Sequence, residues 1–388
     1  MNSVQQIKEQ KECCGCGICA AVCPAKSITM QISPSGKVEP CVGETCVSCG
    51  NCLAVCPQNM NVLGTASVEN ASTAAYVSCK LVQSKNEEIL FNATSGGFVT
   101  TLVKNLLEKG EYDGAFLVDE NHYGRVVQTR RIESGEDLSG TQKSRYVQIS
   151  HTEEIAYILT HREERLILVG TPCYLKGFIK LVEKYKLHRD NFLLVGLFCD
   201  KTMTTHVWEY FDEIFGQGQL EAMHFRSKKD VGWPGDVRLF LQDGKELKLS
   251  RKERMEIKEY FMPECCLDCM DKLNPYADFS VGDDYVSKDA DKKGGNSLII
   301  RTQRGAAVWK DLQNAFEVQE CTWQSIAQSQ HLENREQDLQ ANRQNRLRKL
   351  RLGADRQYKE IRAEVLARRK RNSGFFRRVV ARCKRIFK

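Results

Sequence analysis

Through the middle of the chain, apolar and polar residues follow two different sequence patterns. Short continuous apolar runs predict buried strands, and they occupy residues 114–118, 166–169, 192–198 and 298–300. Apolar residues at helical spacing lie between these runs and predict helices over residues 95–109, 153–161, 172–184, 204–215 and 304–316. Because strands alternate with helices, we expect a mixed α/β core, and further strands near residues 237–249 make the expected fold class α+β. Thr94 or Ser95 is the expected cap of the first helix.

Composition divides the chain into four segments. Residues 1–60 are dense in cysteine and predict a small α+β module of their own. Residues 61–75 are small and polar and predict a linker. Residues 76–325 hold the mixed core, and residues 326–388 predict a helical, basic tail.

The overall composition excludes several classes of protein. With 41% hydrophobic and 28% charged residues, the chain is neither fibrous nor disordered throughout. Its longest apolar run, residues 192–198, is far shorter than the roughly 18 residues that a membrane-spanning helix needs. The polar start MNSVQQIKEQKE lacks the apolar core of a secretion signal, so we expect a cytoplasmic protein. In such a chain, 18 cysteines indicate metal binding rather than disulfides.

Ten of the cysteines lie between Cys13 and Cys56, and eight of them form an internal repeat. The spacing C-x2-C-x2-C-x3-C-P occurs twice, as in bacterial two-cluster ferredoxins, where the fourth cysteine of each run binds the other run's cluster. The predicted ligands of one 4Fe–4S cluster are Cys13, Cys16, Cys19 and Cys56, and those of the other are Cys46, Cys49, Cys52 and Cys23. We expect the fourth cysteine of each run to open a short helix. Cys14 and Cys41 are left without a ligand role, and two structural zinc sites are the alternative.

Four separated motifs mark the large segment. They are Thr94-Ser95-Gly96-Gly97, Gly170-Thr171-Pro172-Cys173, Phe225-Arg226-Ser227-Lys228 with Gly232-Trp233, and Cys266-Leu267-Asp268-Cys269 followed by Ala277-Asp278-Phe279-Ser280-Val281-Gly282-Asp283. In this order behind a two-cluster module, they resemble the coenzyme F-420 hydrogenase/dehydrogenase beta-subunit family over roughly residues 10–305. The resemblance implies an FAD-bearing domain connected to iron–sulfur clusters. It does not imply one substrate, because family members act on a deazaflavin, on chlorophyll precursors or on unknown partners.

The motifs also supply candidate site residues in the large segment. The thiols in family-like positions are Cys173, Cys199, Cys266 and Cys269, and four thiolates complete a third 4Fe–4S cluster. Cys265 could replace Cys266, and in the alternative reading Cys173 faces the flavin as the candidate catalytic thiol.

The remaining candidates are flavin or substrate contacts: Ser95, Gly96, Gly97, Arg226, Lys228 and Trp233. A serine and two glycines at a helix start suit a pyrophosphate. Arg and Lys suit an anion, and Trp offers a stacking face. The alternatives are an ordinary helix start and a solvated basic turn.

The net charge of +7 is concentrated in the tail. Residues 341–388 hold 18 Lys or Arg against 3 Asp or Glu, which leaves 39 against 47 in residues 1–340. Apolar positions 375, 376, 379, 380, 383, 386 and 387 share one helical face. We therefore expect peripheral contact with an anionic membrane at its inner face, with docking onto the protein's own acidic body as the alternative. No nucleic-acid partner is expected, because only charge favours one.

Two functions fit these observations. The first is a flavin-dependent oxidoreductase, in which a small ferredoxin or another redox protein supplies single electrons to the clusters and FAD exchanges electron pairs with an organic acceptor. The second is a non-catalytic electron-transfer subunit of a larger complex. The seven histidines form no recognisable triad, so a hydrolase is not indicated.

Overall fold

The computed structural model describes residues 2–59, 75–118, 126–267, 269–287 and 292–333, and beyond them only 335, 363, 365–367, 370 and 371. Nearly all of the predicted linker 61–75 and all of the amphipathic segment 375–387 lie outside the described residues. Membrane contact by that segment therefore stays a prediction. Among the described helices, none is both long enough and apolar enough to cross a bilayer.

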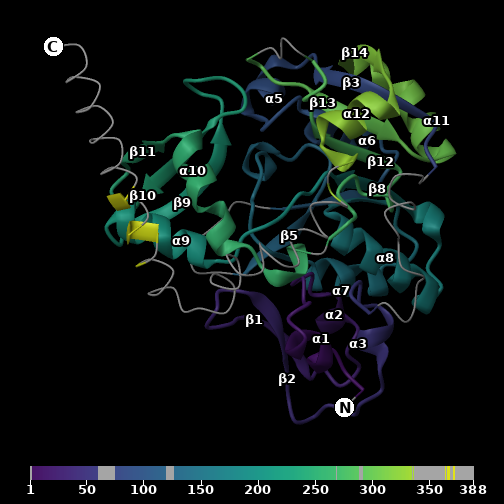
Figure 1. The fold of residues 1–388 in the computed structure, drawn as a ribbon. Coiled ribbons are helices and arrows are strands. Elements are labelled where there is room, and N and C mark those ends of the chain that lie inside the picture. The colour runs from purple at the N-terminus through teal and green to yellow at the C-terminus, as the bar shows by residue number, and fades with distance from the viewer. Residues whose placement is uncertain are drawn as a thin grey trace.

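A nine-stranded mixed sheet forms the centre of the large domain (Figure 1). Its strands in spatial order are β14 (Phe316–Cys321), β3 (Ser78–Ser84), β13 (Asn296–Ile300), β12 (Phe279–Asp283), β8 (Phe192–Leu197), β7 (Leu166–Gly170), β4 (Gly114–Val118), β5 (Val127–Ile132) and β6 (Ile149–Ser150). The four central strands β12, β8, β7 and β4 run parallel, whereas the pairs toward β14 and the pair β4–β5 are antiparallel. The expected α+β class with a mixed core is confirmed.

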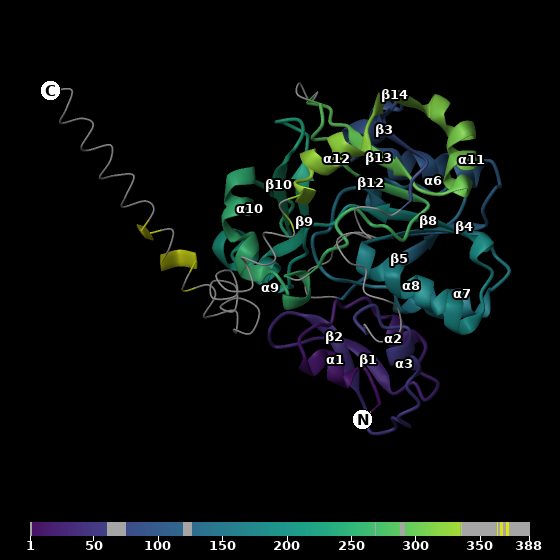
Figure 2. The ribbon, with the colours of Figure 1, turned by 45° about the vertical axis from the view of Figure 1, so that its right-hand side comes forward.

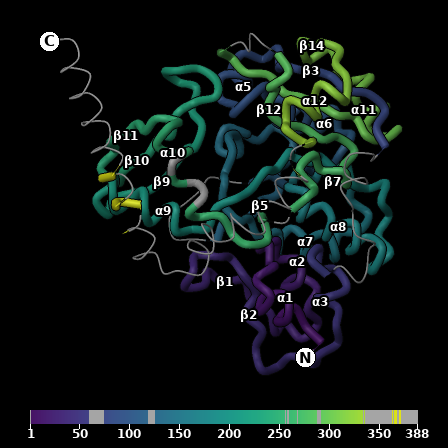
Figure 3. Tube along the Cα trace, viewed as in Figure 1, coloured from purple at the N-terminus to yellow at the C-terminus, as the bar shows by residue number. Residues whose placement is uncertain are grey.

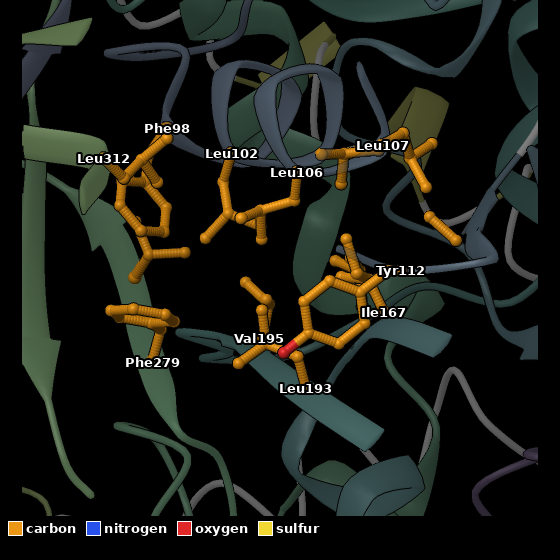
Figure 4. Close-up of a cluster of buried hydrophobic side chains, with 14 of the residues drawn as sticks. Phe98, Leu102, Leu106, Leu107, Tyr112, Ile167, Leu193, Val195, Phe279 and Leu312 are labelled. Carbon is orange, nitrogen blue, oxygen red and sulfur yellow. The ribbon is translucent and has the colours of Figure 1, made fainter. Parts of the chain in front are cut away.

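Helices cover both faces of this sheet, which explains why its central strands are continuous apolar runs. Along β7, Ile167 points into a core under one helical layer, and Leu168 points into a second core on the opposite face. Figure 4 shows Leu102 and Leu106 of one helix packed over the sheet residue Val195. The covering helices are α5 (Glu87–Asn92), α6 (Phe98–Glu108), α7 (Thr152–Thr160), α8 (Pro172–Tyr185), α11 (Gln303–Leu312) and α12 (Trp323–Ser329). A strand that is buried on both faces does not need to alternate apolar and polar residues.

A second, smaller sheet is inserted between β8 and β12 and lies to the side of the first in Figure 1. It contains β9 (Leu220–Ser227), β10 (Asp236–Leu241) and β11 (Glu246–Leu249), all antiparallel. α9 (His206–Phe211), a π-helical turn (Asp212–Gly216) and α10 (Arg251–Ile257) accompany it, and the subdomain has its own apolar core. The strands expected near residues 237–249 are therefore confirmed.

The N-terminal module consists of α1 (Gln5–Glu9), α2 (Ile18–Ala21), β1 (Ile28–Ile32), β2 (Val38–Val42) and α3 (Asn51–Ala54). It sits against α7 and α8 in both views (Figures 2 and 3). Gly177 of α8 permits this close approach, because a Cβ there would lie 2.6 Å from the Ile18 side chain. The Thr152 hydroxyl donates to the Gly17 carbonyl at 3.1 Å, and the Lys180 ammonium donates to the Cys56 carbonyl at 2.7 Å.

Two local expectations are wrong. α6 begins at Phe98 and not at residue 95, because Gly97 adopts a left-handed φ of 79° and neither Thr94 nor Ser95 caps the helix. The fourth cysteines do not open helices. Each of them instead follows a one-turn helix, α2 in one run and α3 in the other.

Candidate iron–sulfur and cofactor sites

The two cysteine runs share one backbone conformation. Each has a left-handed glycine immediately before its one-turn helix, Gly17 and Gly50, both with φ of 77°. Two positions earlier, Gly15 and Ser48 are also left-handed, with φ of 77° and 52°. These turns let the first three thiols of each run converge within a few residues, so the sequence repeat is also a structural repeat.

The first predicted ligand set is brought together inside the module. Burial raises the pKa of the Cys13 thiol to about 12, and the neighbouring Cys56 sulfur adds to the increase. Burial also raises the pKa of Cys19, and both Cys13 and Cys56 contribute to it. The Cys19 and Cys56 sulfurs likewise act to raise the pKa of Cys16. Four clustered sulfurs, two of them buried and two partly buried, oppose one another's ionisation and need a cation to become thiolates together, which fits the iron of a 4Fe–4S cluster.

The second predicted set lines a single pocket of the module. Cys23, Cys46, Cys49 and Cys52 all contribute to the pocket. Cys49 is exposed, and the adjoining Val47 is 67% exposed, so this set lies at the surface of the module. The two sets are neighbours, because Cys52 of the second contributes to the raised pKa of Cys19 in the first.

A third set forms at the carboxyl edge of the main sheet. β7 and β8 are adjacent and parallel with Gly170 opposite Gly196, so the thiols three residues further along, Cys173 and Cys199, leave the same edge. The buried Asn274 amide bridges the two strand ends by donating to the Gly170 carbonyl at 3.0 Å and the Leu197 carbonyl at 3.3 Å. Parallel sheets commonly bind ligands at this edge.

The loop after the small sheet brings the last two thiols to the same place. Burial raises the pKa of Cys199 well above its usual value, and Cys266, Cys173 and Cys269 all contribute. Burial also raises the pKa of Cys269 to about 12. The structure thus brings together all four predicted thiols, and their chemistry fits a third cubane.

Arg335 holds this cysteine loop and was missed from the sequence. Its guanidinium donates to the Cys269 carbonyl at 2.9 and 2.6 Å and to Asp200 at 3.0 Å. A hydrogen bond from Cys265 lowers the pKa of Cys266, and Arg335 and Lys201 lower it further. No motif marks Arg335, because it lies in a polar segment more than sixty residues from the loop.

Cys14 has no ligand role in the ferredoxin spacing, yet it is not isolated. Its thiol donates a hydrogen bond that lowers the pKa of Cys16 and shares another with Cys173. It therefore touches one predicted ligand of the first set and one of the third. Cys41, the other unassigned thiol of the module, is exposed.

The predicted flavin contacts converge on Asp283 at the end of β12. The Arg226 guanidinium donates to its carboxylate at 2.6 and 3.0 Å, and the Trp233 indole donates at 3.3 Å. The Tyr285 hydroxyl adds a contact at 3.3 Å. Burial alone would raise the pKa of Asp283, but Arg226 and hydrogen bonds from Ser95 and Trp233 hold it below its usual value. Asp283 therefore forms a bidentate ion pair with Arg226.

The remaining predicted contact residues form contacts within the protein itself. The buried Lys228 ammonium donates to the Ser95 carbonyl at 2.9 Å, the Lys293 carbonyl at 2.6 Å and the Leu90 carbonyl. The Phe98 amide, first of α6, donates to the Asn296 side chain at 3.1 Å. A Cβ on Gly96 would meet the β3 and β13 backbones within 2.7 Å. Lys228, Gly96 and Gly97 thus fix the loops around Asp283.

A buried polar network was also missed. His151 and Tyr174 stack with ring centroids 3.5 Å apart, and both side chains hydrogen-bond to Glu154. All three are buried, and the His151 amide donates to the Cys16 carbonyl at 2.9 Å. The network lies in the contact between the module and the large domain. No local sequence motif predicts it.

Sequence comparison finds three family models that match successive parts of the chain. Residues 12–60 match the 4Fe-4S dicluster domain. Residues 80–155 match the N-terminal part and residues 163–324 the C-terminal part of the coenzyme F420 hydrogenase/dehydrogenase beta subunit.

Curated relatives have low sequence identity to this chain but align with much of its length. A coenzyme F420-dependent sulfite reductase of Methanocaldococcus jannaschii is 25% identical over 327 residues, which cover 82% of this chain and 48% of the relative. The beta subunit of F420-dependent formate dehydrogenase 1 of Methanococcus maripaludis is 25% identical over 59% of this chain and 58% of its own length. One subunit of the F(420)H(2) dehydrogenase of Methanosarcina mazei is 22% identical over 82% of this chain and 87% of its own length. The chain thus spans about half the length of the sulfite reductase and most of the length of the Methanosarcina mazei protein.

One solved structure shares the fold. A chain of the F420-reducing [NiFe] hydrogenase complex from Methanosarcina barkeri superposes with a TM-score of 0.51 at 19% identity, covering 69% of this chain and 91% of that chain.

Proposed function

The chain belongs to the coenzyme F420 hydrogenase/dehydrogenase beta-subunit family and carries a 4Fe-4S dicluster domain, and from that premise we propose that it is a flavin-dependent iron–sulfur oxidoreductase. It passes electrons between ferredoxin-type clusters and FAD, and then to or from an organic acceptor of the deazaflavin class. One observation carries the proposal: three sets of cysteines follow one another from the surface of the module to the carboxyl edge of the main sheet.

The order of the three sets supports a single electron path. The second set, with exposed Cys49, faces solvent and is the entry point for a small ferredoxin or another redox protein. The first set lies behind it, linked through Cys52 and Cys19. Cys14 then joins the first set to the third through Cys16 and Cys173. Since electron transfer slows steeply with distance, this succession of neighbouring cysteine sets favours fast transfer.

The residues around Asp283 would hold the isoalloxazine end of FAD, which converts single electrons into electron pairs when it is bound. Trp233 offers an aromatic ring beside Tyr285, with ring centroids 5.4 Å apart. Gly294 lets the backbone approach this indole closely, because a Cβ there would lie 2.8 Å from it. Asp283 and Arg226 fix the indole and each other by charge-assisted hydrogen bonds. Cys173 is assigned as a cluster ligand in preference to a catalytic thiol, because it stands among three other predicted ligands.

A second candidate is an electron-transfer subunit that has no substrate of its own. The exposed Cys49 of the second set favours it, because a redox centre at the surface is accessible to a protein partner. Several relatives are also named as subunits. Turnover separates the two: reduction or oxidation of a deazaflavin by the reconstituted chain alone supports the enzyme, and activity only with an added protein supports the subunit.

The cofactor content tests the proposal directly. Chain reconstituted under anaerobic conditions is expected to hold about twelve irons and one FAD, with flavin bands superimposed on broad iron–sulfur absorbance. Iron, sulfide and acid-extracted flavin are measured on the same sample. About eight irons would remove the third cluster from the proposal, and the absence of flavin would leave only the electron carrier.

Replacing Cys14 tests the link between the module and the large domain. The Cys14→Ala variant is expected to keep its full iron content but to lose one hydrogen bond to a cluster ligand. A hydrogen bond worth about 0.5–1.5 kcal/mol corresponds to a fall of about 20–60 mV in the reduction potential of one cluster, because the reduced, more negative state loses its donor. Redox titration followed by electron paramagnetic resonance measures this fall.

Cys41→Ala is the matched control, because this thiol is exposed in the same module. An unchanged set of potentials in Cys14→Ala would show that Cys14 does not contact a ligand. A loss of about four irons would make Cys14 itself a ligand.

A further inference from the structure

Two cysteines outside the three ligand sets lie opposite each other at one side of the main sheet. Cys79 of β3 and Cys321 of β14 are directly paired in the antiparallel ladder between these neighbouring strands (Figure 1). Residues opposite each other in such a ladder have Cα atoms about 4.5–5.5 Å apart and point to the same face of the sheet. A disulfide needs Cα atoms about 4.4–6.8 Å apart. The backbone spacing at this pair therefore suits a disulfide.

The surroundings of the two side chains place both sulfurs in one environment. Both cysteines belong to the apolar cluster that also contains Leu273, Ile299 and Ile326. Burial raises the pKa of Cys321 to about 12, and the Cys79 sulfur makes the next largest contribution to this increase. The two sulfurs are therefore neighbours within one apolar cluster.

The ends of the two strands are aligned, but β14 keeps some freedom to move. Tyr76 and Trp323, which flank the pair, stack with ring centroids 5.4 Å apart and ring planes at 17°. In the described part of the sheet, β14 pairs with β3 alone, so backbone hydrogen bonds restrain it on one side only. The Cβ atoms of opposite residues lie only about 1 Å further apart than those of a disulfide. A small shift of β14 is thus enough to join the sulfurs.

The two thiols differ in their access to solvent. Cys79 is 3% exposed, whereas Cys321 is half-buried. Burial raises the pKa of Cys79 to about 11, and the Arg301 guanidinium opposes part of this increase. A reagent from solution therefore reaches Cys321 first. Cys79 has a cation nearby that favours its thiolate, and it is placed to react second.

We propose that Cys79 and Cys321 form a redox-active pair that closes to an intrachain disulfide by exchange with a low-molecular-weight disulfide. The Cys321 thiolate attacks one sulfur of the small disulfide, forms a mixed disulfide and releases one small thiolate. The Cys79 thiolate then attacks the Cys321 sulfur and releases the second small thiolate. The two protons lost by the protein thiols convert the released thiolates to thiols. Two protein thiols are thus oxidised, and one small disulfide is reduced to two thiols.

Closure of the disulfide would tie the edge strand to the sheet. It would connect positions that are more than two hundred residues apart in the chain. A cross-link over so long a loop strongly restricts the unfolded chain, so the oxidised protein should unfold at a higher temperature. The reaction uses neither flavin nor an iron–sulfur cluster, and the inference is therefore independent of the proposed function.

Peptide mapping tests the pair directly. Full-length, cluster-loaded protein is incubated with oxidised glutathione under anaerobic conditions, and the remaining thiols are alkylated before digestion after glutamate. This digestion gives peptides 70–87 and 321–333, and each contains one of the two cysteines and no other. Mass spectrometry is expected to find these peptides linked to each other. Dithiothreitol is expected to separate them.

Thermal unfolding provides a second measurement and its controls. Oxidation is expected to raise the unfolding temperature of the wild type by about 5 °C or more, and dithiothreitol should reverse the increase. Cys321→Ser is expected to show neither the link nor the increase. Cys41→Ser is the matched control and should behave as the wild type, because Cys41 is an exposed thiol that lies opposite Thr29 in the β1–β2 ladder.

Three results would overturn the inference. The first is wild-type protein whose peptides 70–87 and 321–333 stay unlinked, whether Cys321 is free or carries a glutathione. The second is a link from either cysteine to a different peptide. The third is a link that forms only after the protein has been unfolded in urea, because the native ladder would then not bring the two sulfurs together.

Discussion

Replacing Cys199 by alanine is expected to remove about four of about twelve irons per chain and to abolish electron delivery from the module to the flavin. Among the four thiols of the third set, Cys199 is the most informative one to replace. Cys173 has Cys14 beside it and Cys266 has Cys265 beside it, so a neighbouring sulfur can replace either of them. The sulfurs near Cys199 are the other predicted ligands themselves. The loss of iron and of electron delivery should therefore be larger in Cys199→Ala than in Cys266→Ala.

Iron analysis and stopped-flow reduction of the flavin by a chemically reduced ferredoxin measure the two effects. Cys321→Ala is the matched control, because Cys321 is also half-buried but lies on β14, the far edge strand of the sheet. Its iron content and flavin reduction should equal those of the wild type. A Cys199→Ala protein that keeps twelve irons would show that this thiol is not a ligand and that the cysteines at the sheet edge serve another purpose.

The cysteine sets could be proposed from the sequence by their spacing and by the family resemblance. The first three cysteines of each ferredoxin-type run are close in sequence, and the two-cluster ferredoxin pattern predicts that the fourth ligand comes from the other run. Cys173 and Cys199 each follow a continuous apolar run, and two such runs in a parallel sheet deliver their next residues to one edge. Cys266 and Cys269 were grouped with these two thiols only through the resemblance to the beta-subunit family.

The groups that depend on how separate units pack could not be predicted. Cys14 gains its role only because the module docks against α7 and α8, which brings it to Cys173. Arg226 meets Asp283 only because the small sheet folds back onto the end of β12. No spacing rule links residues that are far apart in the chain and come from two sheets.

Several strands were also missed, and their sequences explain why. β5 (VQTRRI) carries two arginines, and β14 (FEVQEC) is exposed along most of its length. A strand at or near the edge of a sheet has one open side and needs few apolar residues. Its pattern then resembles that of a polar loop. Three of the four central strands, β4, β7 and β8, were found because both of their faces are buried, whereas β12 (FSVGD) was missed.

The Asp283→Asn variant is expected to destabilise the large domain by about 3 kcal/mol. Asparagine keeps the shape of the side chain but leaves the Arg226 charge, only 4% exposed, without its counter-ion. The loss should also reduce flavin retention, because Trp233 loses the acceptor that orients it. Urea unfolding followed by circular dichroism measures the stability, and extracted flavin measures the retention. Asp243→Asn is the control, since Asp243 forms an exposed pair with Lys245 in a surface turn, and no measurable change is expected there.

The pH dependence of this difference identifies its cause. Arg226 holds the pKa of Asp283 below its usual value, so the carboxylate contributes stability at every pH above the ordinary carboxyl range and loses it only as the pH falls through the lower, folded value. The gap between wild type and Asp283→Asn should therefore stay constant from about pH 5 to about pH 8. A gap that narrows steadily from pH 8 to pH 5 would mean that Asp283 takes up a proton in that range. Arg226 would then be balanced by some other group, and the ion pair would not be what holds the small sheet to the end of β12.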